Sequence, residues 1–216
     1  MRPGEAFALV GLNGAGKTTL IKGLLDFTHL DAGEARIFGT PAREPAARAG
    51  LAYLPERFAP QPFLTGGEFL RINAALHREP WDPAAARQTC AALDLEPEAL
   101  GREVAGYSKG MAQKLGLVAG VLSAKPLLVL DEPMSGLDPR ARALLKGLLA
   151  RLRGEGRTLF YSTHLLADVA ALCDRMAILH QGAVRFVGSP ARCLERYGAP
   201  DLEQAFLACI DAPATP

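Results

Sequence analysis

The sequence predicts an α/β fold with a mostly parallel sheet and an inserted lobe of helices. Short apolar runs alternate with helical patterns at both ends of the chain, while the middle carries helical spacing only. A glycine-rich stretch lies between the first apolar run and the first helical pattern. The 216 residues are 49% hydrophobic with a formal net charge of +1, which argues against a disordered chain and a strongly basic nucleic-acid binder.

The first quarter of the chain predicts a strand, a loop and a helix, followed by two further strands. Residues 6–10 (AFALV) form a short apolar run, and apolar residues recur at helical spacing over residues 17–25. Residues 33–39 predict a short surface strand between turn glycines, and residues 50–55 (GLAYLP) a strand of the core. The glycine-rich stretch therefore forms the turn from the first strand into the first helix.

The rest of the chain predicts the helical lobe and then a return to the sheet. Residues 65–123 carry apolar positions three and four residues apart. Strand-like runs and helical patterns then alternate over residues 126–130, 141–153, 158–162, 165–172 and 176–179. Gly182 marks a hairpin, two short helical stretches follow, and we expect the Pro- and Ala-rich last residues to fray.

We therefore expect one domain over residues 1–216. Its catalytic core spans about 1–61 and 125–190, a helical subdomain about 62–124, and a C-terminal helical tail about 190–216. The longest apolar stretch, residues 115–124, is shorter than the ~18 residues that a membrane-spanning helix needs. The start lacks the layout of a secretory signal, and the four cysteines have no CxxC spacing, so we expect a cytosolic chain with free thiols.

The glycine-rich stretch fits the pattern GxxxxGK[ST] in the strand-to-helix context that this pattern requires. It consists of Gly11, Leu12, Asn13, Gly14, Ala15, Gly16, Lys17 and Thr18. Its glycines let backbone N–H groups point at phosphate oxygens, and the positive end of the following helix adds to their field. We expect Lys17 to bridge the β and γ phosphates of ATP, Thr18 to bind Mg²⁺ and Thr19 to contact the α phosphate.

Two acids follow a buried strand in PLLVLDEP. We expect Asp131 to hold Mg²⁺ through water. Glu132 is one residue further and points elsewhere, so we expect it to act as the general base on the attacking water.

With these two motifs, four more resemble the nucleotide-binding domain of ABC ATPases, in the same order and over nearly the whole chain. Residues 107–111 (YSKGM) resemble the family's LSGGQ signature. The resemblance implies that Ser108 and Gly110 meet the γ phosphate bound by a second subunit. Lys109 and Met111 depart from the consensus, and a YSKGM signature resembles the export-type branch of the family.

Two of the other resemblances lie after the acids. Residues 135–138 (SGLD) resemble the D-loop, which couples two sites across a dimer. His164 is similar to the switch histidine, which implies that it senses the γ phosphate and positions the water; His29, His77 and His180 have no such setting.

The chain departs from the family at two places. Glu56 follows Tyr-Leu-Pro where the family usually has a glutamine that contacts Mg²⁺ and the transmembrane partner, and Gln61 is the alternative. We expect the Glu56 carboxylate to accept a hydrogen bond from metal-bound water. The family also has two strands before the residues that match Pro3-Gly4-Glu5, one with an aromatic residue that stacks on adenine, and we expect that this sequence begins downstream of the natural start.

The resemblance implies an ATP-binding and Mg²⁺-dependent ATP-hydrolysing subunit that powers a separate membrane-spanning permease, with an exporter favoured. It implies a homodimer or heterodimer on ATP binding, no nucleic-acid partner, and a place on the inner face of the cell membrane. The alternatives are a soluble ABC-type ATPase associated with ribosomes or DNA, and an inactive regulatory nucleotide-binding subunit. The permease chooses the cargo, so no residue here identifies it.

Overall fold

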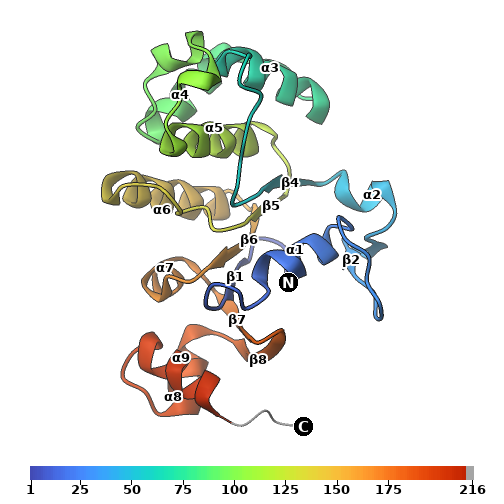
Figure 1. Cartoon of the computed structure of the whole chain (residues 1–216), viewed down its shortest axis with the longest axis vertical. Coiled ribbons are helices and arrows are strands. Elements are labelled where there is room, and N and C mark those ends of the chain that lie inside the picture. Colours follow the sequence, from blue (N-terminus) through green and yellow to red (C-terminus); the bar gives the residue numbers. More distant parts are fainter. Residues whose placement is uncertain (213–216) are drawn as a thin grey trace.

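The computed structural model describes residues 1–212, and these residues are built around a six-stranded sheet (Figure 1). The strand order is β4-β5-β6-β1-β7-β8. All neighbours from β4 to β7 are parallel, and β8 is antiparallel to β7, which confirms the mostly parallel sheet. The strands are β1 Ala6–Val10, β4 Leu51–Leu54, β5 Leu127–Leu130, β6 Thr158–Thr163, β7 Arg175–His180 and β8 Ala183–Gly188.

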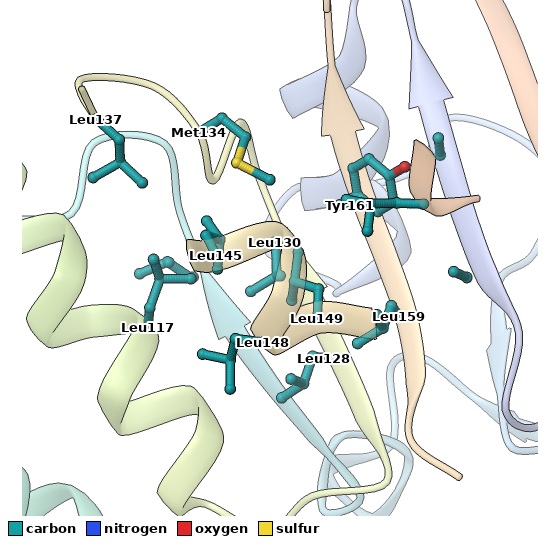
Figure 2. Close-up of a cluster of buried hydrophobic side chains, with 14 of the residues drawn as sticks. Leu117, Leu128, Leu130, Met134, Leu137, Leu145, Leu148, Leu149, Leu159 and Tyr161 are labelled. Carbon is teal, nitrogen blue, oxygen red and sulfur yellow. The ribbon is translucent and has the colours of Figure 1, made fainter. Parts of the chain in front are cut away.

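Helices cover both faces of this sheet, because the strand side chains alternate between two apolar clusters. On β5, Leu128 and Leu130 belong to the larger cluster and Val129 to the smaller one. The larger cluster is closed by leucines of α6, with Leu145 fully buried against the sheet (Figure 2). The smaller cluster is closed by Ile21 of α1. The helices between and after the strands are α1 Lys17–Leu24, α6 Pro139–Gly154, α7 Leu166–Leu172, α8 Pro190–Tyr197 and α9 Leu202–Asp211.

Helices α3, α4 and α5 lie together at one end of the molecule, beyond β4 and β5 (Figure 1). Side chains cap each of them: Thr65 and Glu68 form a capping box on α3, Asp82 caps α4, and Ser108 caps α5. The elements of this region are α3 Gly66–His77, α4 Pro83–Ala92, the 3₁₀ turns η1 Pro97–Gly101 and η2 Val104–Gly106, and α5 Lys109–Leu122. These helices lie within residues 65–123, where the sequence carries helical spacing.

Two details differ from the expectation. The stretch expected as one surface strand forms a two-stranded hairpin, β2 Arg36–Ile37 with β3 Thr40–Pro41. The chain reverses there because Phe38 and Gly39 both have positive φ, at 52° and 80°. A short helix, α2 Pro45–Arg48, was not expected. Over residues 1–212, no helix combines the length and apolar character needed to cross a bilayer, and the expected fraying concerns residues 213–216, outside the described part.

Candidate nucleotide-binding site

The phosphate loop lies at the carboxyl end of β1 and leads directly into α1. Its glycines are needed at this place: a Cβ on Gly11 would lie 2.5 Å from the carbonyl oxygen of Leu179, and Gly14 and Gly16 have φ of 81° and 104°. Gly16 is the N-cap of α1 and supplies no side chain to cap it. The first N–H groups of the helix are therefore free of side-chain caps, as an anion site at a helix N-terminus requires.

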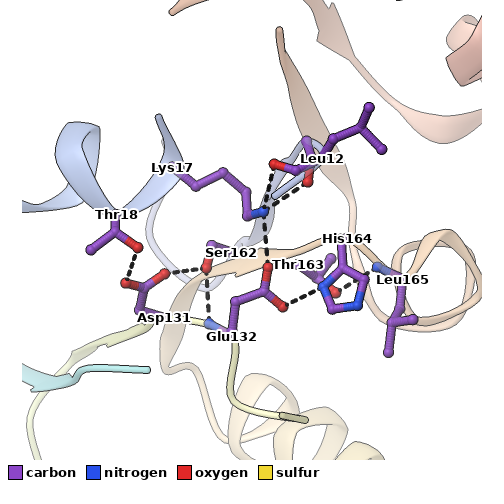
Figure 3. Close-up of polar contacts among 10 residues, drawn as sticks. Leu12, Lys17, Thr18, Asp131, Glu132, Ser162, Thr163, His164 and Leu165 are labelled. Carbon is purple, nitrogen blue, oxygen red and sulfur yellow. Dashed lines mark hydrogen bonds and ion pairs between the residues drawn. The ribbon is translucent and has the colours of Figure 1, made fainter. Parts of the chain in front are cut away.

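Lys17 is held back against this loop. Its side chain is only 6% exposed, and Nζ donates to the carbonyl oxygens of Gly11 at 2.7 Å and Leu12 at 3.2 Å. Nζ also forms an ion pair with Glu132 Oε1 at 3.0 Å (Figure 3). These partners fix the position of the Lys17 ammonium group, so its positive charge lies beside the phosphate loop.

The first acid of the pair is fixed by two hydroxyl groups. Thr18 Oγ1 donates to Asp131 Oδ2 at 2.8 Å, and Ser162 Oγ donates to Asp131 Oδ1 (Figure 3). Ser162 also accepts from the backbone N–H of Glu132 at 2.8 Å, and its side chain is fully buried. The sequence pattern did not predict this role of Ser162. The available signal was a polar residue at the end of a strand that runs beside the strand of the acids.

Glu132 points away from Asp131 and lies between two nitrogen atoms. One carboxylate oxygen contacts Lys17, and the other lies 2.9 Å from Nδ1 of His164 (Figure 3). The backbone of Glu132 has a φ of 47°, which is uncommon for a residue with a side chain and typical of functional sites. The structure thus brings together the three side chains expected to be catalytic.

One pocket brings Glu56 together with the phosphate loop, Lys17 and Glu132, whereas Asp131 and His164 are not among its lining residues. Its lining residues are Asn13, Gly14, Gly16, Lys17, Thr18, Thr19, Glu56 and Glu132. Beside it, burial and the Asp131 carboxylate raise the pKa of Tyr53 to about 12, so this phenol stays neutral.

The donor set in the pocket and directly behind it, where Asp131 is hydrogen-bonded to Thr18, fits a nucleotide phosphate with Mg²⁺. Backbone N–H groups and Lys17 supply positive charge for the phosphates. Thr18 and Asp131 present a hydroxyl and a carboxylate 2.8 Å apart, and oxygen ligands of this kind are those that Mg²⁺ takes in proteins.

Ser108 and Gly110 do not line this pocket. Ser108 is exposed, and its Oγ accepts from the backbone N–H of Met111 at 3.2 Å as the cap of α5. Gly110 packs against the loop after β5, where an added Cβ would lie 3.2 Å from the carbonyl oxygen of Gly136. Within one chain, the expected signature residues therefore lie outside the phosphate-loop pocket.

Comparisons with known proteins identify the family of this chain. The family model described as ABC transporter matches residues 1–135. An uncharacterized ABC transporter ATP-binding protein of Synechocystis is 37% identical over 198 residues, which is 90% of this chain and 56% of that protein. The human retinal-specific phospholipid-transporting ATPase is 33% identical over 92% of this chain and 9% of its own length. This chain thus spans about half the length of the bacterial relative.

Solved structures show the same fold. An ATP-binding subunit of an ABC transporter matches with a TM-score of 0.86 and 31% identity, over 96% of this chain and 88% of that one. A dimeric ATP-binding cassette in a post-hydrolysis state with ADP and phosphate matches with a TM-score of 0.79, over 88% of this chain and 87% of that one. At 19% identity, the second match supports the fold alone. On the family model and the first structure, this chain belongs to the ABC transporter family and is one of its ATP-binding domains.

Proposed function

We propose that this chain binds and hydrolyses ATP with Mg²⁺ and powers a separate membrane-spanning permease. The observation that carries the proposal is the buried Glu132 carboxylate, held between Lys17 and His164 at the edge of a phosphate loop. A buried carboxylate beside a phosphate site is suited to take a proton from water. Intact Lys17, Glu132 and His164 favour an active ATPase over an inactive regulatory subunit.

The residues of this chain have separate roles in the proposed reaction. Lys17 and the N–H groups of the loop bind the phosphates, and Thr18 and Asp131 would hold Mg²⁺, which would neutralise phosphate charge. Glu132 accepts a proton from the attacking water as the bond to the γ phosphorus forms, and the electron pair of the broken bond leaves with ADP. His164 orients the carboxylate and the water. Glu56, which lines the same pocket, would accept a hydrogen bond from water on the bound Mg²⁺.

A second copy completes the site. Ser108 and Gly110 lie outside the pocket of their own chain, so we assign them to the ATP bound by a partner copy, as the family signature implies. A two-fold dimer places both signatures symmetrically. We divide the chain into three proposed parts: a catalytic core at about 1–61 and 125–190, a helical subdomain at about 62–124, and a C-terminal tail from about 190.

Transport in the outward direction is the finer part of the proposal. The human relative is named as a phospholipid-transporting ATPase, and the YSKGM sequence of residues 107–111 resembles the export-type branch. The surface around Glu56 and the helical subdomain is the proposed contact with the permease. The chain would then act at the inner face of the cell membrane.

The test is light scattering of a Glu132→Gln variant with and without MgATP. Removing the base blocks hydrolysis and keeps the phosphate contacts, so the variant should double its mass when MgATP is added. Glu195→Gln, an exposed change on α8, is the charge-matched control and should remain active. A Glu132→Gln variant that binds ATP and stays monomeric would contradict the dimeric site, and a wild-type chain that does not hydrolyse ATP would contradict the proposed reaction.

A further inference from the structure

The segment that follows Glu132 is fixed to the core on one side and to α5 on the other. Met134 and Leu137 are 3% and 5% exposed, and they belong to the same buried cluster as Leu117 of α5 and Leu145 of α6 (Figure 2). Residues 133–137 therefore form an ordered connection between the proposed base and α6, anchored by apolar side chains.

One face of α5 lies along this connection. Gly110 and Gln113 both contact it, and Leu117 shares its apolar cluster, at the spacing of three and four residues that places side chains on one face of a helix. Gln113 Nε2 donates to the carbonyl oxygen of Pro133 at 3.5 Å. A Cβ added to Gly136 would lie 3.3 Å from Cδ and Cε of Lys109, so the Lys109 side chain also packs against this connection.

The polar contact of Gln113 is unusual for its place. Gln113 is 3% exposed on a helix whose buried face is otherwise mainly apolar. Burying an amide is unfavourable unless it is hydrogen-bonded, and an apolar residue of the same length would fill the space at lower cost. The amide therefore points to a requirement at Pro133 other than packing.

Pro133 is the residue next to Glu132, and the backbone is held by side chains on both sides of the base. Ser162 accepts from the N–H of Glu132, and Gln113 donates to the carbonyl of Pro133. Between these two bonds, Glu132 adopts its left-handed conformation with a φ of 47°. A residue in this region keeps its conformation only where its surroundings impose it.

We propose that Gln113 is a positioning residue for Glu132 and connects the signature end of α5 to the catalytic base. The proposal rests on the base assigned to Glu132 under the proposed function. Ser108 and Gly110 lie at the N-terminus of the same helix, less than two turns from Gln113. Contact of that end with the ATP of a partner copy would thus reach the backbone beside Glu132 of its own chain.

The test replaces Gln113 by methionine, which keeps the length and removes the donor, and by asparagine, which keeps the amide one methylene short. Val121→Ala is the control, because it removes packing from the same helix about 12 Å further along. Both Gln113 variants should lose at least about ten-fold in kcat, the range expected when a base is misplaced, with little change in KM for ATP. In a Glu132→Gln background, Gln113→Met should cause no further loss in single-turnover hydrolysis.

A second readout does not depend on hydrolysis. The ¹⁵N resonance of His164 Nδ1 reports its 2.9 Å contact with Glu132, and the chain has only four histidines to assign. Both Gln113 variants should shift this resonance in the folded protein, and Val121→Ala should leave it unchanged. A folded Gln113→Asn variant with wild-type kcat and an unmoved His164 resonance would overturn the proposal. A shifted resonance in a chain without ATPase activity would refute the proposed function and keep the positioning.

Discussion

Replacing Ser162 by alanine removes one hydroxyl that serves both acids of the site. In the folded protein, the change leaves the buried N–H of Glu132 without its acceptor, which costs ~1–3 kcal/mol. It also takes one of two hydroxyl donors from the fully buried Asp131, and a hydrogen bond to a charged group contributes ~1.5–3 kcal/mol. We expect the free energy of unfolding to fall by about 2.5–6 kcal/mol in total.

The assay is urea unfolding followed by the fluorescence of the single tryptophan, Trp81, together with the thermal midpoint. For a chain of this size, the expected loss lowers Tm by roughly 5–24 °C. Ser123→Ala is the matched control, because Ser123 is 1% exposed and its hydroxyl donates to the carbonyl of Gly120 at a helix end. It should cost about 1 kcal/mol.

The difference in unfolding free energy between the two variants tests whether the Ser162 hydroxyl holds the acids. If Ser162→Ala loses no more stability than Ser123→Ala, the hydroxyl does not hold the acids, and the double contact in the structure carries no net energy. A stability loss of the expected size should come with weaker MgATP hydrolysis, because Asp131 then loses one of its two hydroxyl donors and the backbone N–H of Glu132 loses its acceptor.

Three further changes test the site and the core. His164→Ala should lower kcat about 100-fold while a fluorescent ATP analogue still binds, since the contact with Glu132 orients the base and not the nucleotide; unchanged turnover would exclude this role. Glu56→Gln removes a negative charge from the phosphate pocket and should raise the Mg²⁺ concentration for half-maximal turnover, and an unaltered Mg²⁺ titration would count against a metal role. Burial raises the pKa of the thiols of Cys90 and Cys193 from 9.0 to about 11, so the folded chain keeps protons that the unfolded chain loses. The free energy of unfolding should therefore fall as pH rises from about 9 to 11 in denaturant titrations, and a flat profile would contradict this linkage.

Contiguous motifs could be predicted from the sequence because their chemistry is local. The phosphate loop needs glycines, a lysine and a threonine at fixed spacing between a strand and a helix, and all of these are visible along the chain. The two acids after β5 could be predicted in the same way, because the strand that precedes them is recognisable as a run of apolar residues. The hairpin of β2 and β3 was missed because a positive φ at Phe38, beside Gly39, has no reliable signal in a non-glycine residue.

By itself, the sequence determined the order of the core strands and the longer helices, the phosphate loop and the identity of the two acids, but not the β2–β3 hairpin or α2. Only the tertiary structure decided that Ser162 bonds to Asp131 and to Glu132, and that Gln113 reaches Pro133. The physical reason is the parallel pairing of β5 with β6, which sets residues about 30 positions apart side by side. Strand register and helix packing fix such contacts, and neither is encoded in the spacing of any one segment.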